Sequence, residues 1–229
     1  MIKSQRYLLK KRCFHGILHI YEGQKVLGIF LDTETNGLNH RKHKILELAF
    51  KVIDVCTGTL VDQFESVVFQ SPKDWKSADP SSLQVTGFTY EEICLKGRPK
   101  KEIVANILTR FKNLGIKRGQ AVFICQNPSF DRAFFAQLID PDLQEKLGWP
   151  YHWLDLASMH WSKNTELAWE KGVSKDKIAL SCGLPPEDKP HRAMNGVNHL
   201  LMCYEAIIGF PRKSGTHAGT GTGTKEGRG

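Results

Sequence analysis

Residues 25–38 read Lys25-Val26-Leu27-Gly28-Ile29-Phe30-Leu31-Asp32-Thr33-Glu34-Thr35-Asn36-Gly37-Leu38. The apolar run that ends at Leu31 is typical of a strand buried on both faces, in the middle of a sheet. Asp32 and Glu34 follow it directly, and acids two residues apart in an extended chain project to the same side. Their mutual repulsion at the end of a buried strand is costly, and a bound divalent cation removes that cost. A solvated turn is the simpler explanation when this motif stands alone.

The apolar patterns that follow this stretch predict the rest of a mixed sheet. Residues 45–55 and 60–69 predict two strands that continue the first into an antiparallel meander. Residues 121–125 predict a second buried strand, reached through a helix over 101–114 and therefore expected to run parallel to the first. A short strand over 151–154 completes the set, and further helices are expected over 129–139, from 155, over 175–182 and over 193–208. This order indicates an α/β fold with a mixed five-stranded sheet flanked by helices.

The length of 229 residues suits one full-sized domain, which we place at residues 26–211. Residues 1–25 form an N-terminal extension whose apolar patch at 16–21 is compatible with an edge strand or a short helix. Residues 212–229 are rich in Gly and Thr and are expected to be disordered. Within the domain, a long polar connection precedes Thr89, which is expected to cap a helix turn.

The net charge of +8 does not by itself indicate nucleic-acid binding. The first 12 residues hold five basic side chains and no acid, and residues 212–229 hold four basic side chains and one acid. These two ends account for the whole net charge, so the domain between them is formally neutral. Basic ends attract phosphate without sequence preference, but they are also common on other soluble proteins.

The six cysteines lie far apart and form no Cys-x-x-Cys pair, which argues against a structural zinc site and a disulfide framework. This usage predicts a cytoplasmic protein in a reducing compartment. No apolar run approaches the roughly 18–20 residues that span a bilayer, so we expect no membrane partner.

Two further segments carry chemistry. Asn127 and Asp131 follow the strand over 121–125, and Asp131 falls in the first turn of a predicted helix, where it could simply complement the helix dipole. Because sites in such sheets gather at the carboxyl ends of strands, we expect Asp131 to lie near Asp32. His191 precedes the last predicted helix, and an imidazole there can deprotonate a water, although most surface histidines are inert.

In order along the chain, these segments resemble the DnaQ-like 3′–5′ exonucleases of the Asp-Glu-Asp-Asp-His type. Residues 32–37 are similar to the first motif of that family, residues 127–131 to the second, and residues 191–194 to the start of the third. Residues 43–48 resemble the strand that follows the first motif, residues 85–89 an intermediate turn, and residues 153–156 a segment whose acid, here Asp155, is more often a helix cap than a catalyst.

The resemblance implies a ribonuclease-H-like fold and a metal-dependent exonuclease. Such an enzyme hydrolyses phosphodiester bonds from the 3′ ends of single-stranded DNA or RNA and releases nucleoside 5′-monophosphates. It implies two Mg²⁺ or Mn²⁺ ions held by Asp32, Glu34 and Asp131, with His191 as general base. Core packing is the expected role of Phe134. The resemblance also implies nucleotide contacts from Thr33, Thr35, Leu38, Glu47, Asn127 and Phe130.

One acid of the family pattern is missing. The third motif has an aspartate five residues after its histidine, and here that position is Gly196. Glycine offers no side-chain oxygen, so activity should fall steeply unless another group replaces it. The candidates are Glu187 and Asp188 just upstream, and, less suited as ligands or by position, Asn195, Asn198 and His199. The alternative function is therefore a catalytically impaired relative that binds nucleic-acid ends or a polymerase partner. DNA versus RNA and the oligomeric state stay open.

Overall fold

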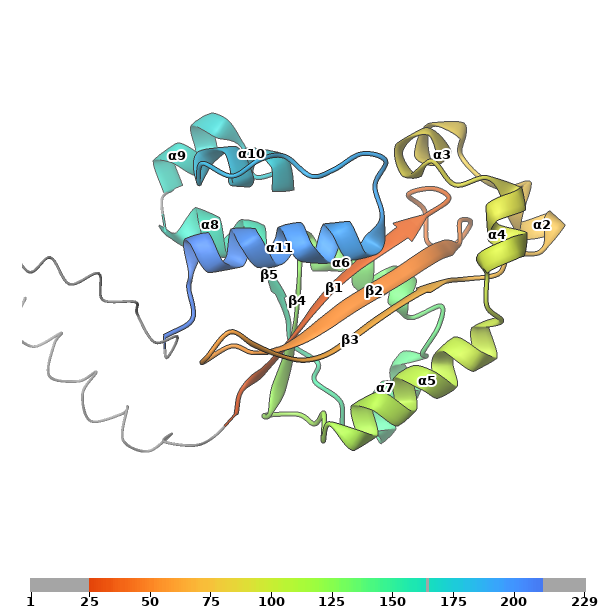
Figure 1. The fold of residues 1–229 in the computed structure, drawn as a ribbon, viewed down its shortest axis with the longest axis horizontal. Coiled ribbons are helices and arrows are strands. Elements are labelled where there is room, and N and C mark those ends of the chain that lie inside the picture. The colour runs from red at the N-terminus through yellow and green to blue at the C-terminus, as the bar shows by residue number, and fades with distance from the viewer. Residues whose placement is uncertain (1–24, 164, 212–229) are drawn as a thin grey trace, which may run out of the picture.

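The computed structural model describes residues 25–163 and 165–211 (Figure 1). The apolar patch predicted at 16–21 and the predicted tail at 212–229 lie outside these residues. No helix within the described part of the chain is both long and apolar enough to cross a membrane.

The centre of the fold is a five-stranded mixed sheet, as predicted. Its strands are β1 (Leu27–Thr35), β2 (Ile45–Asp54), β3 (Thr59–Val67), β4 (Ala121–Cys125) and β5 (Trp153–Asp155), in the order β3-β2-β1-β4-β5. β2 runs antiparallel to both β1 and β3, whereas β4 runs parallel to both β1 and β5. β1 extends to Thr35, so Asp32 and Glu34 lie within the strand, opposite Ala49 and Glu47 of β2, and not after it.

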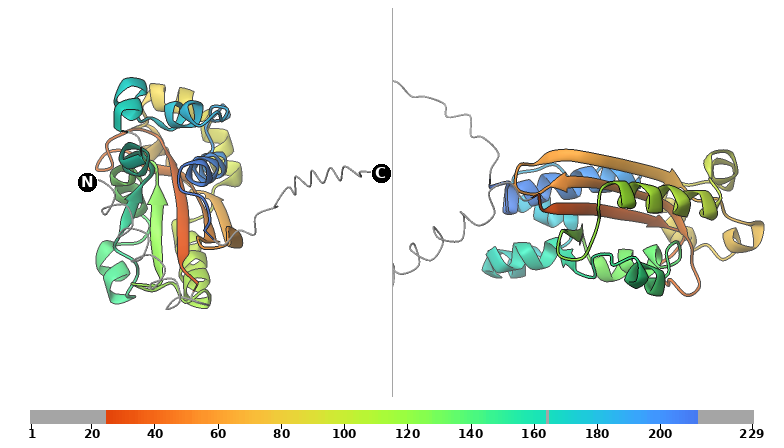
Figure 2. Two further views of the ribbon diagram at one scale, coloured as in Figure 1. Left: turned by 90° about the vertical axis from the view of Figure 1, so that its left-hand side faces the viewer. Right: turned by 90° about the horizontal axis from the view of Figure 1, so that it is seen from below.

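One face of the sheet carries an aromatic core beneath α5 (Lys100–Asn113) and α6 (Pro128–Phe135), with α7 (Pro141–Lys146) following α6 (Figure 2). Phe134 is fully buried there, which confirms its expected role in packing. α6 ends four residues earlier than the predicted helix. Leu138 and Ile139 remain buried after the helix has ended, so the apolar spacing continues past its last turn.

The other face carries a core of smaller side chains beneath α11 (Ala193–Ile207). α8 (Leu156–Lys163) and α10 (Lys175–Ser181) contribute Leu156, Ile178 and Ala179 to this core, and α9 (Thr165–Lys171) connects them. In Figure 1, α11 lies across β1 and β2 with its first turn toward the carboxyl end of β1. α6 on one face of the sheet and α11 on the other thus both lie near the carboxyl end of β1.

The connection between β3 and α5 contains three short helices, α2 (Pro72–Trp75), α3 (Pro80–Thr86) and α4 (Tyr90–Lys96). The sequence predicted only the turn capped by Thr89, whose side-chain oxygen accepts a hydrogen bond from the Glu92 N–H at 3.1 Å. The other two helices are too short for an apolar period to be recognised. Each is also capped, by Ser71 and by Asp79.

Candidate active site

β1 supplies the first two acids of the site. Alternation along the strand places Ile29 and Leu31 in the aromatic core and Phe30 in the opposite core. Asp32 and Glu34 therefore share the face of Phe30, which is the face covered by α11. The side chain of Asp32 is 14% exposed, and Glu34 is buried. The predicted pair of acids on one side of the strand is present.

Asp131 comes from the other face of the sheet, in the first turn of α6. It is almost fully buried, and the Thr33 hydroxyl donates a hydrogen bond of 2.9 Å to its Oδ1. Because Thr33 points away from the α11 side of β1, this bond joins α6 to the end of the strand from the opposite face. Asp131 lines the same cavity as Asp32 and Glu34.

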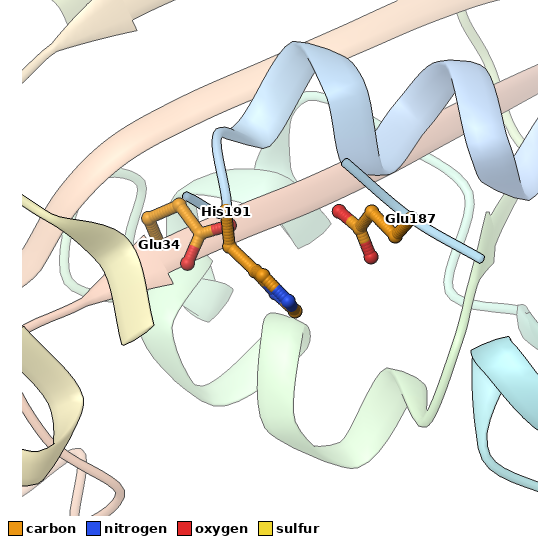
Figure 3. A group of neighbouring side chains, drawn as sticks. All are labelled: Glu34, Glu187 and His191. Atoms are coloured by element: carbon orange, nitrogen blue, oxygen red, sulfur yellow. The ribbon is translucent and has the colours of Figure 1, made fainter. Parts of the chain in front are cut away.

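The segment before α11 brings a histidine and a fourth carboxylate to the site. Ligand atoms of Glu34, Glu187 and His191 all lie within 4.8 Å of one another, and Figure 3 shows these side chains converging from the end of β1 and from the chain that leads into α11. The side chain of Glu187 is only 2% exposed. From the sequence, Glu187 was only one of several candidates to replace the aspartate missing at position 196.

Lys175, the first residue of α10, is the member of the site that the sequence did not reveal. Its Nζ lies 2.7 Å from Oε2 of Glu187 and 3.5 Å from Oδ1 of Asp32. Burial alone would lower the pKa of this ammonium, but the Asp32 and Glu187 carboxylates outweigh burial and raise the pKa above its ordinary value. A lysine at the start of a helix is an ordinary surface residue in sequence, so no local signal marks it.

Burial makes the acids of the site reluctant to ionise. It raises the pKa of Asp32 to about 6, against the opposing effect of Lys175. It raises the pKa of Glu34 to about 9, with the Asp32 carboxylate adding to the effect. Burial, followed by the charge of Asp32, also holds the pKa of Asp131 well above its usual range. Such crowding of desolvated carboxylates is typical of functional sites that receive a cation.

Two adjoining cavities open at this end of the sheet. The first, of about 270 Å³, is lined by the acids, Lys175 and His191. The second, of about 260 Å³, is lined by residues of β1, the loop after it, α3 and α6, among them Thr35, Leu38 and Phe130. Thr33, Glu34 and Phe130 line both cavities. Four predicted nucleotide contacts, Thr33, Thr35, Leu38 and Phe130, are thus brought together beside the acids.

Two predicted nucleotide contacts, Glu47 and Asn127, line neither cavity. Glu47 lies opposite Glu34, but its carboxylate accepts a 2.7 Å hydrogen bond from the Ala193 N–H at the start of α11. Asn127 precedes α6 in the left-handed conformation, and its N–H donates to Asp155 Oδ1. Asp155 also accepts from the Ala157 and Ser158 N–H groups, which makes it the expected cap of α8.

The other candidates for replacing the missing acid lie elsewhere. Asp188 is exposed, and the side-chain oxygen of Asn198 accepts a hydrogen bond from Lys51 Nζ. His199 is buried, with Nε2 2.8 Å from the carbonyl oxygen of Pro185. Asn195 lines neither cavity. Glu187 is the candidate that reaches the cavity of the acids.

The model of one known family matches most of this chain. The RNase_T model, described as an exonuclease family, matches residues 29–197, a span that contains the acids of β1, Asp131 and His191. The chain belongs to the RNase_T exonuclease family. This membership confirms the resemblance to DnaQ-like exonucleases that the motifs indicated.

A curated relative of this exonuclease domain is DNA polymerase III PolC-type from Staphylococcus aureus. The two are 33% identical over 106 residues, which is 46% of this chain. The chain spans about 6% of the length of that relative, and the same holds for the relative from Staphylococcus epidermidis.

Solved structures of exonucleases share the fold. The zinc-bound complex of E. coli ExoI with ssDNA matches 80% of this chain and 40% of its own, with a TM-score of 0.62 and 15% identity. The nuclease domain of 3′hExo, a DEDDh family member bound to rAMP, matches 79% of this chain and 90% of its own, with a TM-score of 0.60 and 10% identity. The expected ribonuclease-H-like fold is therefore confirmed.

The residues of the first cavity fit a divalent cation. Their donors are mainly carboxylate oxygens, which hard divalent cations prefer. Within the described residues, Glu187 Oε1 is one of only three buried side-chain atoms that have no hydrogen-bond partner. Such an atom, beside Glu34 and His191, has an open coordination site in a place with excess negative charge.

Proposed function

We propose that this exonuclease domain is a metal-dependent 3′–5′ exonuclease that hydrolyses phosphodiester bonds from the 3′ ends of single-stranded nucleic acid and releases nucleoside 5′-monophosphates. The observation that carries the proposal is the convergence of Asp32, Glu34, Asp131 and His191 on one open cavity, from β1, α6 and the start of α11. Burying acids this deeply lowers the stability of a fold, and cation binding explains why such acids are present.

The acids of β1 and α6 are proposed to hold Mg²⁺ or Mn²⁺. Asp32 and Glu34 point to one side of the strand, and Asp131 reaches its end from the opposite face. Bound divalent cations would supply a Lewis acid for the scissile phosphate. The protein contributes carboxylates that the strand, the helix and the Thr33 hydrogen bond hold at one place.

His191 is proposed to accept the proton of the attacking water. It lines the first cavity, and its backbone N–H donates to the Val85 carbonyl at 3.1 Å, which ties the segment before α11 to α3. An imidazole is the side chain best suited to take a proton near neutral pH. Ligand atoms of Glu34 and Glu187 lie within 4.8 Å of the His191 ring, beside the acids.

The second cavity is proposed to take the terminal nucleotide of the strand. Leu38 and Phe130 offer it apolar and aromatic contacts, while Thr33 and Thr35 lie next to the acids. Stacking on an aromatic ring tolerates every base, which suits removal of any 3′ nucleotide. The ssDNA and rAMP named with ExoI and 3′hExo support a single-stranded substrate without deciding between DNA and RNA.

The alternative, an impaired exonuclease that only binds nucleic-acid ends or a polymerase partner, is favoured by two features. Lys175 places an ammonium between Asp32 and Glu187, where a cation is otherwise expected, and Gly196 removes a ligand. The PolC-type relative supports a polymerase as the partner in that case.

Digestion of single-stranded DNA and RNA oligonucleotides distinguishes the two functions. With Mg²⁺ or Mn²⁺, a 5′-labelled strand should shorten stepwise from its 3′ end, and a 3′-labelled strand should release its label as a mononucleotide at once. EDTA and the isosteric Asp32→Asn change should each abolish trimming, whereas Asp188→Asn at the exposed neighbour should leave it intact. If the unaltered protein trims no faster than Asp32→Asn, the enzyme proposal is wrong and the binding function takes its place.

A further inference from the structure

Gly196 lies on the face of α11 that points at the acids of β1. A Cβ added there would overlap Oδ2 of Asp32, would lie 2.6 Å from Cγ of Asp32 and would lie 3.1 Å from Oε1 of Glu187. The space that a side chain at 196 would enter therefore already holds the carboxylates of Asp32 and Glu187. The glycine allows α11 to approach the strand this closely.

The Glu187 carboxylate is arranged as a ligand with one free oxygen. Oε2 is paired with Lys175, but Oε1 is buried and has no hydrogen-bond partner. A buried acceptor left without a partner destabilises a fold, and a charged one does so more strongly. The same carboxylate lies within 4.8 Å of donor atoms of Glu34 and His191. A cation beside these three groups would satisfy the free oxygen.

Three contacts hold the loop before Glu187 in this position. His199 of α11 lies with Nε2 2.8 Å from the Pro185 carbonyl, which can only accept, so Nε2 is the donor. The Glu187 N–H donates to Asp176 Oδ1 at 3.0 Å, and its side chain meets Lys175. Two adjacent residues of α10 thus hold the backbone and the side chain of the same glutamate. A loop fixed by both α10 and α11 delivers its acid reproducibly.

We propose that Glu187 is a metal-binding carboxylate that takes the place of the aspartate missing at 196, and that Lys175 is the counter-charge that positions it. This inference rests on the proposed metal-dependent function. The carboxylate reaches the cavity from a loop, and its Oε1 lies 3.1 Å from the point at which a side chain at 196 would begin. Lys175 offsets the repulsion between Asp32 and Glu187, and its four-carbon chain allows the ammonium to move aside as a cation enters.

Titration with Mn²⁺ in the absence of nucleic acid tests this role. Binding is followed by calorimetry and by the electron paramagnetic resonance signal of free Mn²⁺. Glu187→Gln keeps the size of the side chain and removes its charge, and it should weaken Mn²⁺ binding about tenfold or more. Asp188→Asn is the matched control, because it removes an exposed acid next along the chain, and it should bind Mn²⁺ as the unaltered protein does.

A double change guards against a folding defect in the single variant. Glu187→Gln leaves the buried Lys175 ammonium with Asp32 as its remaining ion-pair partner. Glu187→Gln combined with Lys175→Met removes both members of the Lys175–Glu187 ion pair together. The double variant should melt cooperatively and show the same loss of Mn²⁺ affinity, measured also as a smaller rise in melting temperature on adding Mn²⁺.

The outcomes separate this inference from the proposed function. Unchanged Mn²⁺ affinity in both Glu187 variants overturns the role of Glu187, even where the protein trims oligonucleotides. Affinity that depends on Glu187 supports it, even where no trimming is seen and the exonuclease proposal fails. Absence of Mn²⁺ binding by the unaltered protein overturns both.

Discussion

Two helices approach the end of β1 from opposite faces of the sheet, and the two sides supply acids in different ways. α6 carries Asp131 in its own first turn, so the helix backbone places this carboxylate and one bond from Thr33 completes its position. α11 carries Gly196 in its first turn, and the acid on this side comes from Glu187 in the loop ahead.

The difference shows that a carboxylate can be placed by a helix or by contacts around a loop. On the α6 side the helix backbone positions the Asp131 carboxylate, and the neighbouring core is aromatic. On the α11 side the position of the acid depends on Lys175, Asp176 and His199, which lie far from it in sequence or on other elements. The α6 side should therefore tolerate changes of length poorly, and the loop side should tolerate them better.

Changing the length of each acid by one methylene should show the largest contrast. Asp131→Glu adds a methylene to an almost fully buried carboxylate that the helix and Thr33 hold in place, and we expect oligonucleotide cleavage to fall about 100-fold, which corresponds to about 2.7 kcal/mol. Glu187→Asp shortens an acid without introducing any overlap, and cleavage should fall less than about tenfold. Both are measured as kcat/KM on one labelled strand; equal losses in the two variants would break the comparison.

The pH dependence of stability should respond to Glu34, which faces the loop side. The unfolded chain releases this proton near pH 4.5, whereas the folded chain keeps it until about pH 9, so the unfolded state binds fewer protons between these values. Metal-free protein should then lose stability as the pH rises, by about 2–3 kcal/mol between pH 5 and 7 from this group alone.

Urea unfolding in EDTA across this pH range measures the effect. Glu34→Gln should reduce the slope and should make the protein more stable than the unaltered chain at pH 7; the remaining slope comes from the other buried acids, Asp32 and Asp131, whose pKa values burial also raises. Asp188→Asn serves as the exposed control and should leave the slope unchanged. A Glu34→Gln protein with the original slope would show that another group carries the pH dependence.

Gly196→Ala tests the close approach of α11. Alanine favours a helix over glycine by about 0.5–1 kcal/mol, but its methyl group would overlap Asp32, and overpacking costs about 1–3 kcal/mol. We expect a net loss of about 1–2 kcal/mol in the free energy of unfolding. In an Asp32→Ala background the loss should largely disappear, because the overlapping carboxylate is gone. Stabilisation by Gly196→Ala in the unaltered background would contradict the geometry.

The smallest expected effects come from removing one supporting bond on each side. Thr33→Val keeps the shape of the side chain and deletes the bond to Asp131, and Asp176→Ala deletes the acceptor for the Glu187 N–H. Each should cost about 1 kcal/mol of stability. Only Asp176→Ala should also weaken Mn²⁺ binding several-fold, because only the loop depends on it; calorimetry on the two variants makes the distinction.

The sheet could be predicted because each main strand is marked by the pattern of apolar residues in its own short stretch of sequence. Continuous apolar runs identified β1 and β4, and the two-residue spacing of Asp32 and Glu34 placed both acids on one side of the strand. The proximity of Asp131 followed from the rule that parallel strands end at the same edge. These features depend on the periodicity of the chain, and a sequence displays that directly.

The rest of the site was not predictable because it depends on how distant elements dock. Lys175 reaches the acids only because α10 packs beside α11. Glu47 of β2 pairs with Glu34 of β1 and lies on the same face of the sheet. The first turn of α11, however, gives the Glu47 carboxylate the Ala193 N–H as a partner. Glu187 could be named as a candidate from sequence, but the course of its loop is set by bonds that no local pattern encodes.

Gly196 and Glu187 also constrain how this site can diverge. An aspartate at 196 would meet the Asp32 carboxylate first and the Glu187 carboxylate next, and loss of Glu187 alone would leave the α11 side without an acid. A change at only one of the two positions would therefore give a protein with two acids on the α11 side or with none. We therefore expect the two positions to covary among related sequences, so that relatives with aspartate at 196 carry no acid at 187.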